Sequence, residues 1–324
     1  MPDLFIWSSI FILTLVTLIV SADFFIKSAE RIGLALGIPP FIVGVTLIAM
    51  GTSLPELVTS IIAVLSPNAD SAIVPGNVLG SNITNSCLVL GFIGVMARHV
   101  KMEFDILKVD LPMFLGAAVI MYLTTMDGKF SQFEGIVCLA ALGMYLAYIV
   151  SLGRTEPDQP PLVDESEAPP RGKISWKEPL ILMASGTVIY LSAKYNVDSI
   201  RYLASMLRIG KEFIALTAVA LGTSLPELVV SIVAVRKNNA EMAIGNILGS
   251  NIFNVFAVMG IPRLFGVIEV PGTITEFSLP AMLGATVLCL IAVQDRVVTR
   301  WEGWILLLFY GLYIGGLVEG ILPT

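Results

Sequence analysis

The sequence predicts an all-α membrane protein with ten transmembrane helices, arranged as two inverted repeats of five. Apolar residues make up 56% of the 324 residues and charged residues only 14%, whereas about a quarter of an average soluble domain is charged. Apolar runs of about 20 residues recur, and each is long enough to cross a bilayer as a helix. Two nearly identical polar motifs, one in each half, lie inside such runs. Helices are expected because lipid cannot satisfy an open backbone.

The ten predicted spans divide equally between the two halves. In the first half they are 4–26, 39–65, 72–97, 107–126 and 132–152, and in the second 179–200, 211–236, 240–265, 276–294 and 302–322. The intervening segment is rich in proline and acids, so a flexible solvated linker is expected there. The predicted units are therefore 1–152, the linker 153–178, and 179–324. No basic stretch precedes the first apolar run, which favours a retained helix over a cleaved signal.

An internal repeat covers most of both halves. Gly51–Ser60 reads GTSLPELVTS, and Gly222–Ser231 reads GTSLPELVVS. Further along, Gly76–Asn85 reads GNVLGSNITN, and Gly245–Asn254 reads GNILGSNIFN. Because each half contains an odd number of spans, the second copy is expected to enter the membrane in the opposite orientation.

The placement of lysine and arginine supports this inversion, since cytoplasmic loops carry an excess of both. With both termini outside and the central linker in the cytoplasm, 13 of the 19 basic residues fall on the cytoplasmic side. The loop 66–70 after the first motif has no basic residue, while its counterpart after the second has Arg236 and Lys237. The basic cluster from Lys194 to Lys211 would lie outside, which suggests that span six is longer and tilted.

Glu56 and Glu227 fall near the middle of their predicted spans. A carboxyl at that depth costs about 2.5 kcal/mol or more on insertion scales, so it indicates function by default. A protonated carboxyl bonded to a neighbouring hydroxyl is the alternative. Two glutamates in identical contexts, one in each half, favour a functional site.

The residues beside the two glutamates supply further oxygens. Thr52 and Ser53 precede Glu56 by four and three positions, so their side chains share a helix face. Pro55 cannot donate a hydrogen bond, which frees backbone oxygens near Met50 and Gly51. The hydroxyls that recur in both copies are those of Thr52, Ser53, Thr223 and Ser224.

The companion motif adds hydroxyls and amides at helical spacing. Ser81 and Asn85 are four residues apart, as are Ser250 and Asn254. The glycines of this motif form a smooth surface that lets another helix approach closely. They are Gly76, Gly80, Gly245 and Gly249.

These side chains are hard oxygen ligands, which suit Ca²⁺ and, by the same reasoning, Na⁺. Transition metals prefer histidine or cysteine. His99 is the one histidine and lies in a short basic loop; the three cysteines fall in apolar segments and are expected to be small buried hydrophobic residues. Two carboxylates would neutralise one Ca²⁺. Inverted repeats that meet at interrupted helices in mid-membrane are typical of alternating-access transporters.

At these motifs the chain resembles the cation/Ca²⁺ exchanger superfamily, specifically its prokaryotic Na⁺/Ca²⁺ antiporter-like members. The resemblance implies the ten-helix sodium/calcium exchanger fold, with spans one and six as long sliding helices. It also implies a set of ion ligands. These are the carboxylates of Glu56 and Glu227, the side chains of Thr52, Ser53, Thr223, Ser224, Ser81, Ser250, Asn85 and Asn254, and the backbone carbonyls of Ala49 and Ala220.

The sequence thus predicts an antiporter that exchanges Ca²⁺ for Na⁺, located as a multi-pass protein in the plasma (inner) membrane. A H⁺/Ca²⁺ or K⁺-dependent antiporter is the alternative, because some members of the superfamily carry an aspartate where this chain has Asn254. A cation channel and an intramembrane enzyme are less favoured, since the inverted repeat closes one site within the chain and no nucleophile–histidine set is available. We expect no cofactor, no enzymatic activity and no nucleic-acid partner; the sequence does not indicate an oligomeric state.

Overall fold

The computed structural model describes residues 2–65, 71–97, 99–101, 110–152, 174–206, 224–272 and 274–321. The described part is helical except for two short antiparallel strand pairs. β1 (His99–Lys101) pairs with β4 (Val297–Thr299), and β2 (Lys129–Phe130) pairs with β3 (Ile268–Glu269). Each pair joins one strand from the first half to one from the second.

The first half contains eight described α-helices. They are α1 (Pro2–Leu36), α2 (Pro40–Val43), α3 (Ala49–Thr52), α4 (Leu54–Leu65), α5 (Ile73–Ile83), α6 (Leu90–Ala97), α7 (Asp110–Thr125) and α8 (Gln132–Leu152). A π-helical segment at Gly44–Ile48 joins α2 to α3, and another at Thr84–Val89 joins α5 to α6. Such wide turns inside helices frequently mark functional sites.

The second half repeats this order over its described residues. Its helices are α9 (Lys177–Met206), α11 (Leu225–Arg236), α12 (Ala240–Phe253), α13 (Met259–Arg263), α14 (Leu279–Val293) and α15 (Arg300–Ile321). π-helical turns lie at Asn254–Val258, between α12 and α13, and at Ile274–Ser278, before α14. The turn that follows α12 therefore matches the turn that follows α5 in the first half.

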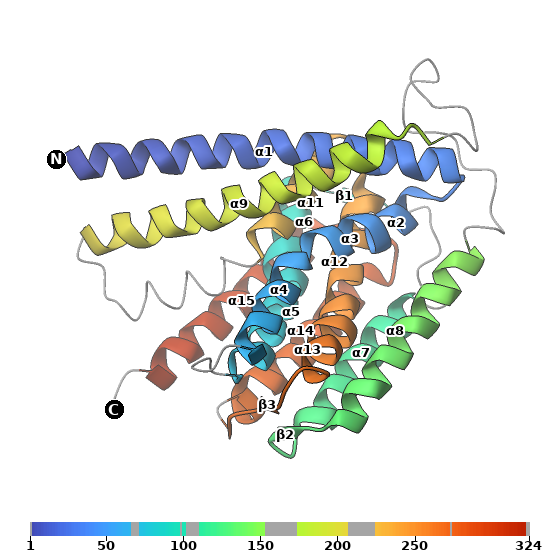
Figure 1. Cartoon of the computed structure of the whole chain (residues 1–324), viewed down its shortest axis with the longest axis vertical. Helices are drawn as coiled ribbons and strands as arrows, with labels where there is room; N and C mark the ends of the chain where they lie inside the picture. Colours follow the sequence, from blue (N-terminus) through green and yellow to red (C-terminus); the bar gives the residue numbers. More distant parts are fainter. Residues whose placement is uncertain are drawn as a thin grey trace.

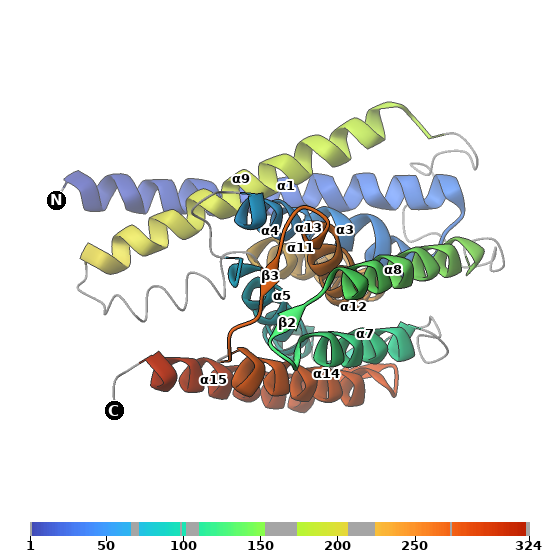
Figure 2. The same cartoon turned by 60° about the horizontal axis from the view of Figure 1, so that its bottom comes forward.

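The long helices α1 and α9 lie side by side and cross one face of the remaining helices (Figures 1 and 2). With 35 residues, α1 continues ten residues beyond the predicted end of span one. At 1.5 Å per residue it is about 52 Å long, well above the roughly 30 Å of a hydrocarbon core. With 30 residues, α9 is also longer than its predicted span, as the basic cluster near Lys194 suggested.

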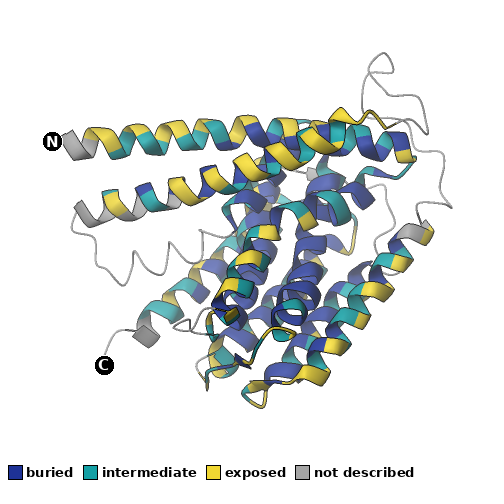
Figure 3. Ribbon diagram, in the orientation of Figure 1, coloured by how far each residue is buried: buried dark blue, intermediate teal, exposed yellow. Residues whose placement is uncertain are grey.

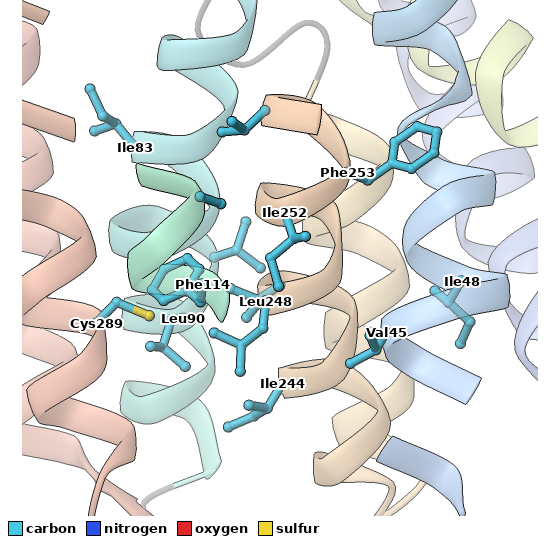
Figure 4. Packing of buried hydrophobic residues seen from close by; sticks show 14 of the residues in the cluster. Val45, Ile48, Ile83, Leu90, Phe114, Ile244, Leu248, Ile252, Phe253 and Cys289 are labelled. Atoms are coloured by element: carbon cyan, nitrogen blue, oxygen red, sulfur yellow. The ribbon is translucent and has the colours of Figure 1, made fainter. Parts of the chain in front are cut away.

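Helix α12 is the centre of the bundle. In the most apolar 18 residues of the span Ala240–Arg263, 94% are buried, against 28% in the corresponding stretch of the span Phe5–Leu36 within α1. Figure 3 shows the same contrast between the inner helices and the outer pair. Phe114, Leu90 and Cys289 gather on the side of α12 that carries Leu248 (Figure 4). The cysteines Cys87, Cys138 and Cys289 are free and buried, so the prediction that they are packing residues is confirmed.

Glycines allow α12 to lie directly against the π-helical segment Gly44–Ile48. A Cβ atom added at Gly245 would collide with the carbonyl oxygen of Phe41, and one added at Gly249 with that of Val45. Gly44 faces the backbone of Met242 in the same way. The predicted close approach is therefore confirmed for Gly245 and Gly249. Gly76 and Gly80 have no comparably close neighbour among the described residues.

Seven of the described helical spans are long and apolar enough to cross a membrane: Phe5–Leu36, Pro40–Leu65, Ile73–Met96, Gln132–Ile149, Ala240–Arg263, Ile274–Val293 and Arg300–Val318. The apolar helix α7 is shorter, with 16 residues. The protein is therefore a helical multi-pass membrane protein. The number of ten spans and their division at the linker 153–178 stay predictions.

Candidate functional site

In the first copy of the GTSLPEL motif the helix is interrupted at Ser53, and in the second copy a helix begins directly after the equivalent Ser224. Ser53 has φ −88° and ψ 2°, and Ser224 has φ −90° and ψ 5°. This region between helix and extended chain is sparsely populated and is common in active sites. The next helix begins at the following leucine, so the motif proline falls in its first turn, where it is tolerated. The helix is therefore interrupted at the serine itself, slightly later than the predicted opening near Met50 and Gly51.

The interruption places each glutamate in the first turn of a helix. Glu56 lies there in α4 and Glu227 in α11, and both are completely buried. The positive end of the helix dipole favours a negative charge at that position. Neither glutamate has a positively charged residue among its described contacts. A buried carboxylate needs a positive partner, so this arrangement is expected of groups that bind a cation.

Side chains of the two halves meet at the glutamates. The Ser53 hydroxyl donates a hydrogen bond to Oε1 of Glu227 over 3.3 Å, and the Thr52 hydroxyl donates to Oδ1 of Asn246 over 3.3 Å. The structure therefore joins into one site two motifs that lie more than 170 residues apart.

The companion helices α5 and α12 meet through asparagines. Nδ2 of Asn254 donates to Oδ1 of Asn82 over 3.1 Å, and Nδ2 of Asn85 donates to Oδ1 of Asn251 over 3.3 Å. Nδ2 of Asn251 donates in turn to the Ser86 hydroxyl over 2.8 Å. These bonds link the helices that present Asn85 and Asn254 to the site.

The structure places the remaining predicted residues as follows. Ser81 and Ser250 are buried, and the Ser250 hydroxyl donates to Oδ1 of Asn246 over 3.5 Å. Ala49 is buried, and its carbonyl oxygen accepts from the Ser53 backbone N–H over 3.1 Å and from the Thr52 hydroxyl over 3.4 Å. Ala220 and Thr223 lie outside the described residues.

Six buried oxygen atoms of this site have no hydrogen-bond partner among the residues that the structure describes. Buried polar atoms in native proteins are almost always hydrogen-bonded, so such a group requires an explanation. All six are acceptors or hydroxyls, and they come from both halves of the chain. They are Oε1 and Oε2 of Glu56, Oε2 of Glu227, Oγ of Ser224, and Oδ1 of Asn85 and of Asn254.

Sequence reasoning missed four asparagines that hold this site together: Asn77, Asn82, Asn246 and Asn251. Each is buried. The signal was present, because these asparagines recur at the same two positions of both companion motifs. The prediction considered only the asparagine four residues after the serine, although Asn77 and Asn246 lie four residues before it and share the same helix face.

Helix α1 covers the first motif. The Phe25 ring of α1 packs on Gly51, where an added Cβ would lie 2.6 Å from the ring. The same ring contacts Gly186 of α9. The pair of long helices is thus seated directly over the start of the interrupted helix.

The family model described as "Sodium/calcium exchanger protein" matches residues 7–151 and 177–318. The chain belongs to the sodium/calcium exchanger family. This is a family of transporters and not of enzymes, and the resemblance stated from the motifs is confirmed.

Several relatives match this member of the family over most of their length. It is 34% identical to the putative antiporter CaxA of Alkalimonas amylolytica over 94% of this chain and 96% of that protein. It is 33% identical to the sodium/calcium exchanger MaX1 of Methanosarcina acetivorans, with the same coverage. A solved structure of the sodium-calcium exchanger NCX_Mj soaked with Na⁺ and Sr²⁺ matches with a TM-score of 0.80 and 28% identity, covering 96% of this chain and 99% of that one.

Proposed function

We propose that this protein exchanges Ca²⁺ for Na⁺ across the membrane by alternating access. One observation carries the proposal: six buried oxygens, contributed by both halves and including three of the four oxygens of the two carboxyls, lack a hydrogen-bond partner among the described residues. Oxygen ligands of this kind suit Ca²⁺ and Na⁺. The names of the relatives, which include exchangers of sodium and calcium, support the same choice of ions.

Within this proposal, Glu56 and Glu227 are shared by both ions. Hydroxyls, amides and carbonyls of the two repeats complete the coordination. These ligands are Thr52, Ser53, Thr223, Ser224, Ser81, Ser250, Asn85 and Asn254, with the backbone carbonyls of Ala49 and Ala220. Two carboxylates neutralise one Ca²⁺ or two Na⁺. Ca²⁺ and Na⁺ therefore compete for the same two carboxylates. If access switches only when the carboxylates are neutralised, the empty protein does not cycle and leak is suppressed.

We further propose that ten spans form two inverted five-helix units, with both termini outside an inner membrane and the linker 153–178 in the cytoplasm. The repeated motifs and the bias of lysine and arginine support this topology. The outer helices α1 and α9 would slide across the other helices to open the site to alternate sides, as in transporters built from inverted repeats.

Uptake of ⁴⁵Ca²⁺ into proteoliposomes loaded with Na⁺ tests the ion pair. We expect uptake to follow the outward Na⁺ gradient and to vanish when Na⁺ is equal on both sides or when K⁺ replaces Na⁺ inside the vesicles. Uptake that ignores the Na⁺ gradient but follows a pH gradient would replace the proposal with H⁺/Ca²⁺ antiport. A requirement for K⁺ together with Na⁺ would point to K⁺-dependent exchange.

The Asn254→Asp variant is expected to acquire a pH dependence. A third carboxyl leaves one negative charge uncompensated when Ca²⁺ is bound, and a proton restores neutrality. Ca²⁺ exchange by the variant should therefore slow as the pH rises, while that of the wild type changes less. Parallel pH profiles for the two proteins would show that the charge of the site does not limit switching.

Polar contacts tie α1 to the loop between α11 and α12. Asp23 of α1 forms an ion pair with Lys237 over 2.5 Å, and Glu30 accepts a hydrogen bond from Asn239 over 2.6 Å. Asn239 also caps α12, because its Oδ1 accepts from the backbone N–H of Met242. In the proposed topology both contacts lie on the cytoplasmic side and favour the conformation seen here.

Removing the Asp23–Lys237 pair is expected to shift the population away from this conformation. Partly exposed ion pairs contribute up to about 1 kcal/mol, which corresponds to a shift of about fivefold. Lys237→Gln should broaden the distance distribution between spin labels on exposed Phe24 of α1 and Phe133 of α8. Lys27→Gln is the matched control, since Lys27 pairs with the same aspartate but within α1. Equal distributions for both variants would contradict the role of the pair.

A further inference from the structure

Asn246 of α12 is completely buried between the two motifs and contacts three hydroxyl groups. Its Nδ2 donates to Oγ of Ser231 over 2.9 Å. Its Oδ1 accepts from Thr52 over 3.3 Å and from Ser250 over 3.5 Å. Thr52 belongs to the first half and Ser250 to the second, and both are among the proposed ion ligands. Ser231 lies one turn after Glu227 on α11.

A hydroxyl that binds a cation must turn its single proton away from the ion. It has one O–H donor and two acceptor lone pairs. In a buried site that proton needs an acceptor. If a carboxylate ligand such as Glu227 accepted it, the hydroxyl would point its proton at that carboxylate and both would be less available to the ion. Oδ1 of Asn246 has two lone pairs and is bonded by two hydroxyls. The other acceptor near Thr52 is the Ala49 carbonyl over 3.4 Å, but that oxygen is itself a proposed ion ligand and already accepts from the Ser53 N–H, so with an ion bound the Thr52 proton is left for Asn246. The lone pairs of Thr52 and Ser250 are thereby left for a cation.

The oxygen and nitrogen of an asparagine side chain must be assigned from their hydrogen-bond partners. For Asn246, the equivalent asparagine of the first half supplies this assignment. Asn77 is the counterpart of Asn246, and its Nδ2 lies 3.4 Å from the main-chain oxygen of Glu56 and 3.4 Å from Oγ of Ser60. A main-chain oxygen can only accept, so the amide nitrogen must face α4. Ser60 and Ser231 hold the same motif position. The equivalent orientation turns Nδ2 of Asn246 toward α11 and its oxygen toward the hydroxyls.

We propose that Asn246 is a positioning residue for cation binding. Its carbonyl oxygen takes the protons of the Thr52 and Ser250 hydroxyls and directs their lone pairs toward the ion. Its amide nitrogen ties this arrangement to α11, the helix that carries Glu227. The inference rests on the proposed function, in which Thr52 and Ser250 bind Ca²⁺, and it adds a residue that acts through these ligands without touching the ion.

A double-mutant cycle between Asn246 and Thr52 tests this role. The dissociation constant for Ca²⁺ is measured by calorimetry on the purified full chain in Na⁺-free buffer. Asn246→Ala is expected to weaken Ca²⁺ binding by about 10- to 100-fold, the usual effect of losing an outer hydrogen bond to a metal ligand. Thr52→Val removes a proposed ligand and should weaken binding at least as much. The double variant should bind about as weakly as the weaker single variant, because both remove the same arrangement.

Asn246→Asp separates positioning from packing. Aspartate keeps the shape of the side chain and an oxygen that accepts from Thr52 and Ser250. Thr52→Val should therefore still weaken Ca²⁺ binding in the Asn246→Asp background, and no longer do so in the Asn246→Ala background. A purely structural asparagine would give the same effect of Thr52→Val in both backgrounds. Thr286→Val is the matched control, since this buried hydroxyl bonds only the Met282 carbonyl of its own helix over 2.8 Å and should leave Ca²⁺ binding unchanged.

Two outcomes overturn the inference: losses that multiply in the double variant, or an Asn246→Ala protein that binds Ca²⁺ as tightly as the wild type. Either result, with a wild type that binds Ca²⁺, leaves the proposed function intact. A wild type that does not bind Ca²⁺ contradicts the proposed function and this inference with it. The melting temperature is recorded for every variant without and with Ca²⁺. If Asn246→Ala melts at the same temperature as the wild type without Ca²⁺, but Ca²⁺ raises its melting temperature less, the result supports positioning.

Discussion

Replacing Glu227 by glutamine is expected to abolish Ca²⁺ exchange, with a loss of at least about 100-fold. Glutamine keeps the size of the side chain and can still accept the hydrogen bond from Ser53. It halves the negative charge of the site and turns one ligand oxygen into an N–H donor that repels a cation. Glu56→Gln should have the same effect, because neither oxygen of Glu56 has a hydrogen-bond partner that would reveal a structural role.

The measurement is Na⁺-driven ⁴⁵Ca²⁺ uptake at equal amounts of reconstituted protein. Folding should not suffer, since a neutral amide is easier to bury than a carboxylate. The melting temperature in Ca²⁺-free buffer is therefore expected to be unchanged or higher. Glu276→Gln is the matched control, because Glu276 is exposed and far from the motifs in sequence. Undiminished exchange by either glutamine variant of the site would refute the assignment of the two carboxyls.

Gly249→Ala is expected to be the most damaging of the small substitutions. The added Cβ would lie 2.7 Å from Cα of Val45 and 2.8 Å from Cβ of Ala49, besides meeting the Val45 carbonyl oxygen. These are backbone or near-backbone atoms, so no side chain can rotate away. Overpacking a core usually destabilises by about 1–3 kcal/mol, and here it also pushes the π-helical segment before Ala49 away from α12. We expect both lower stability and loss of exchange.

Thermal unfolding in detergent and ⁴⁵Ca²⁺ uptake measure the two effects separately. Gly143→Ala is the matched control, since Gly143 is exposed on α8 with no described atom within 4 Å of an added Cβ. Gly80→Ala compares the same motif position in the first half, where an added Cβ meets no described atom within 4 Å. If Gly249→Ala were as stable and active as Gly143→Ala, the close contact between the two halves would not be needed.

The two glycine positions illustrate how far sequence symmetry can be taken. Gly80 and Gly249 occupy the same place in identical motifs, and from the sequence both are predicted to permit a close helix approach. Gly249 makes this approach to the segment Gly44–Ile48, which belongs to the other half of the chain. The equivalent segment of the second half, 215–219, lies outside the described residues, so the close approach stays a prediction for Gly80.

The asparagines give a second example. Spacing within one helix placed Ser81 and Asn85 on a common face, and this is a local property that a sequence contains. The bond from Asn254 to Asn82 joins residues 172 positions apart. No periodicity within a helix encodes such a contact, so the repeat shows that Asn82 and Asn251 hold the same position but not which residues they meet.

The sequence by itself determined the membrane class, the helical content, the two repeated motifs and the oxygen chemistry of the candidate site. These follow from composition, run length and residue type, which act locally along the chain. Only the tertiary structure decided where the helices break, how far α1 extends, and that Ser53 reaches Glu227 while Thr52 reaches Asn246. Those features depend on which helices pack together. The packing of α12 depends on close backbone contact at Gly245 and Gly249 and on hydrogen bonds between polar groups that are buried away from water.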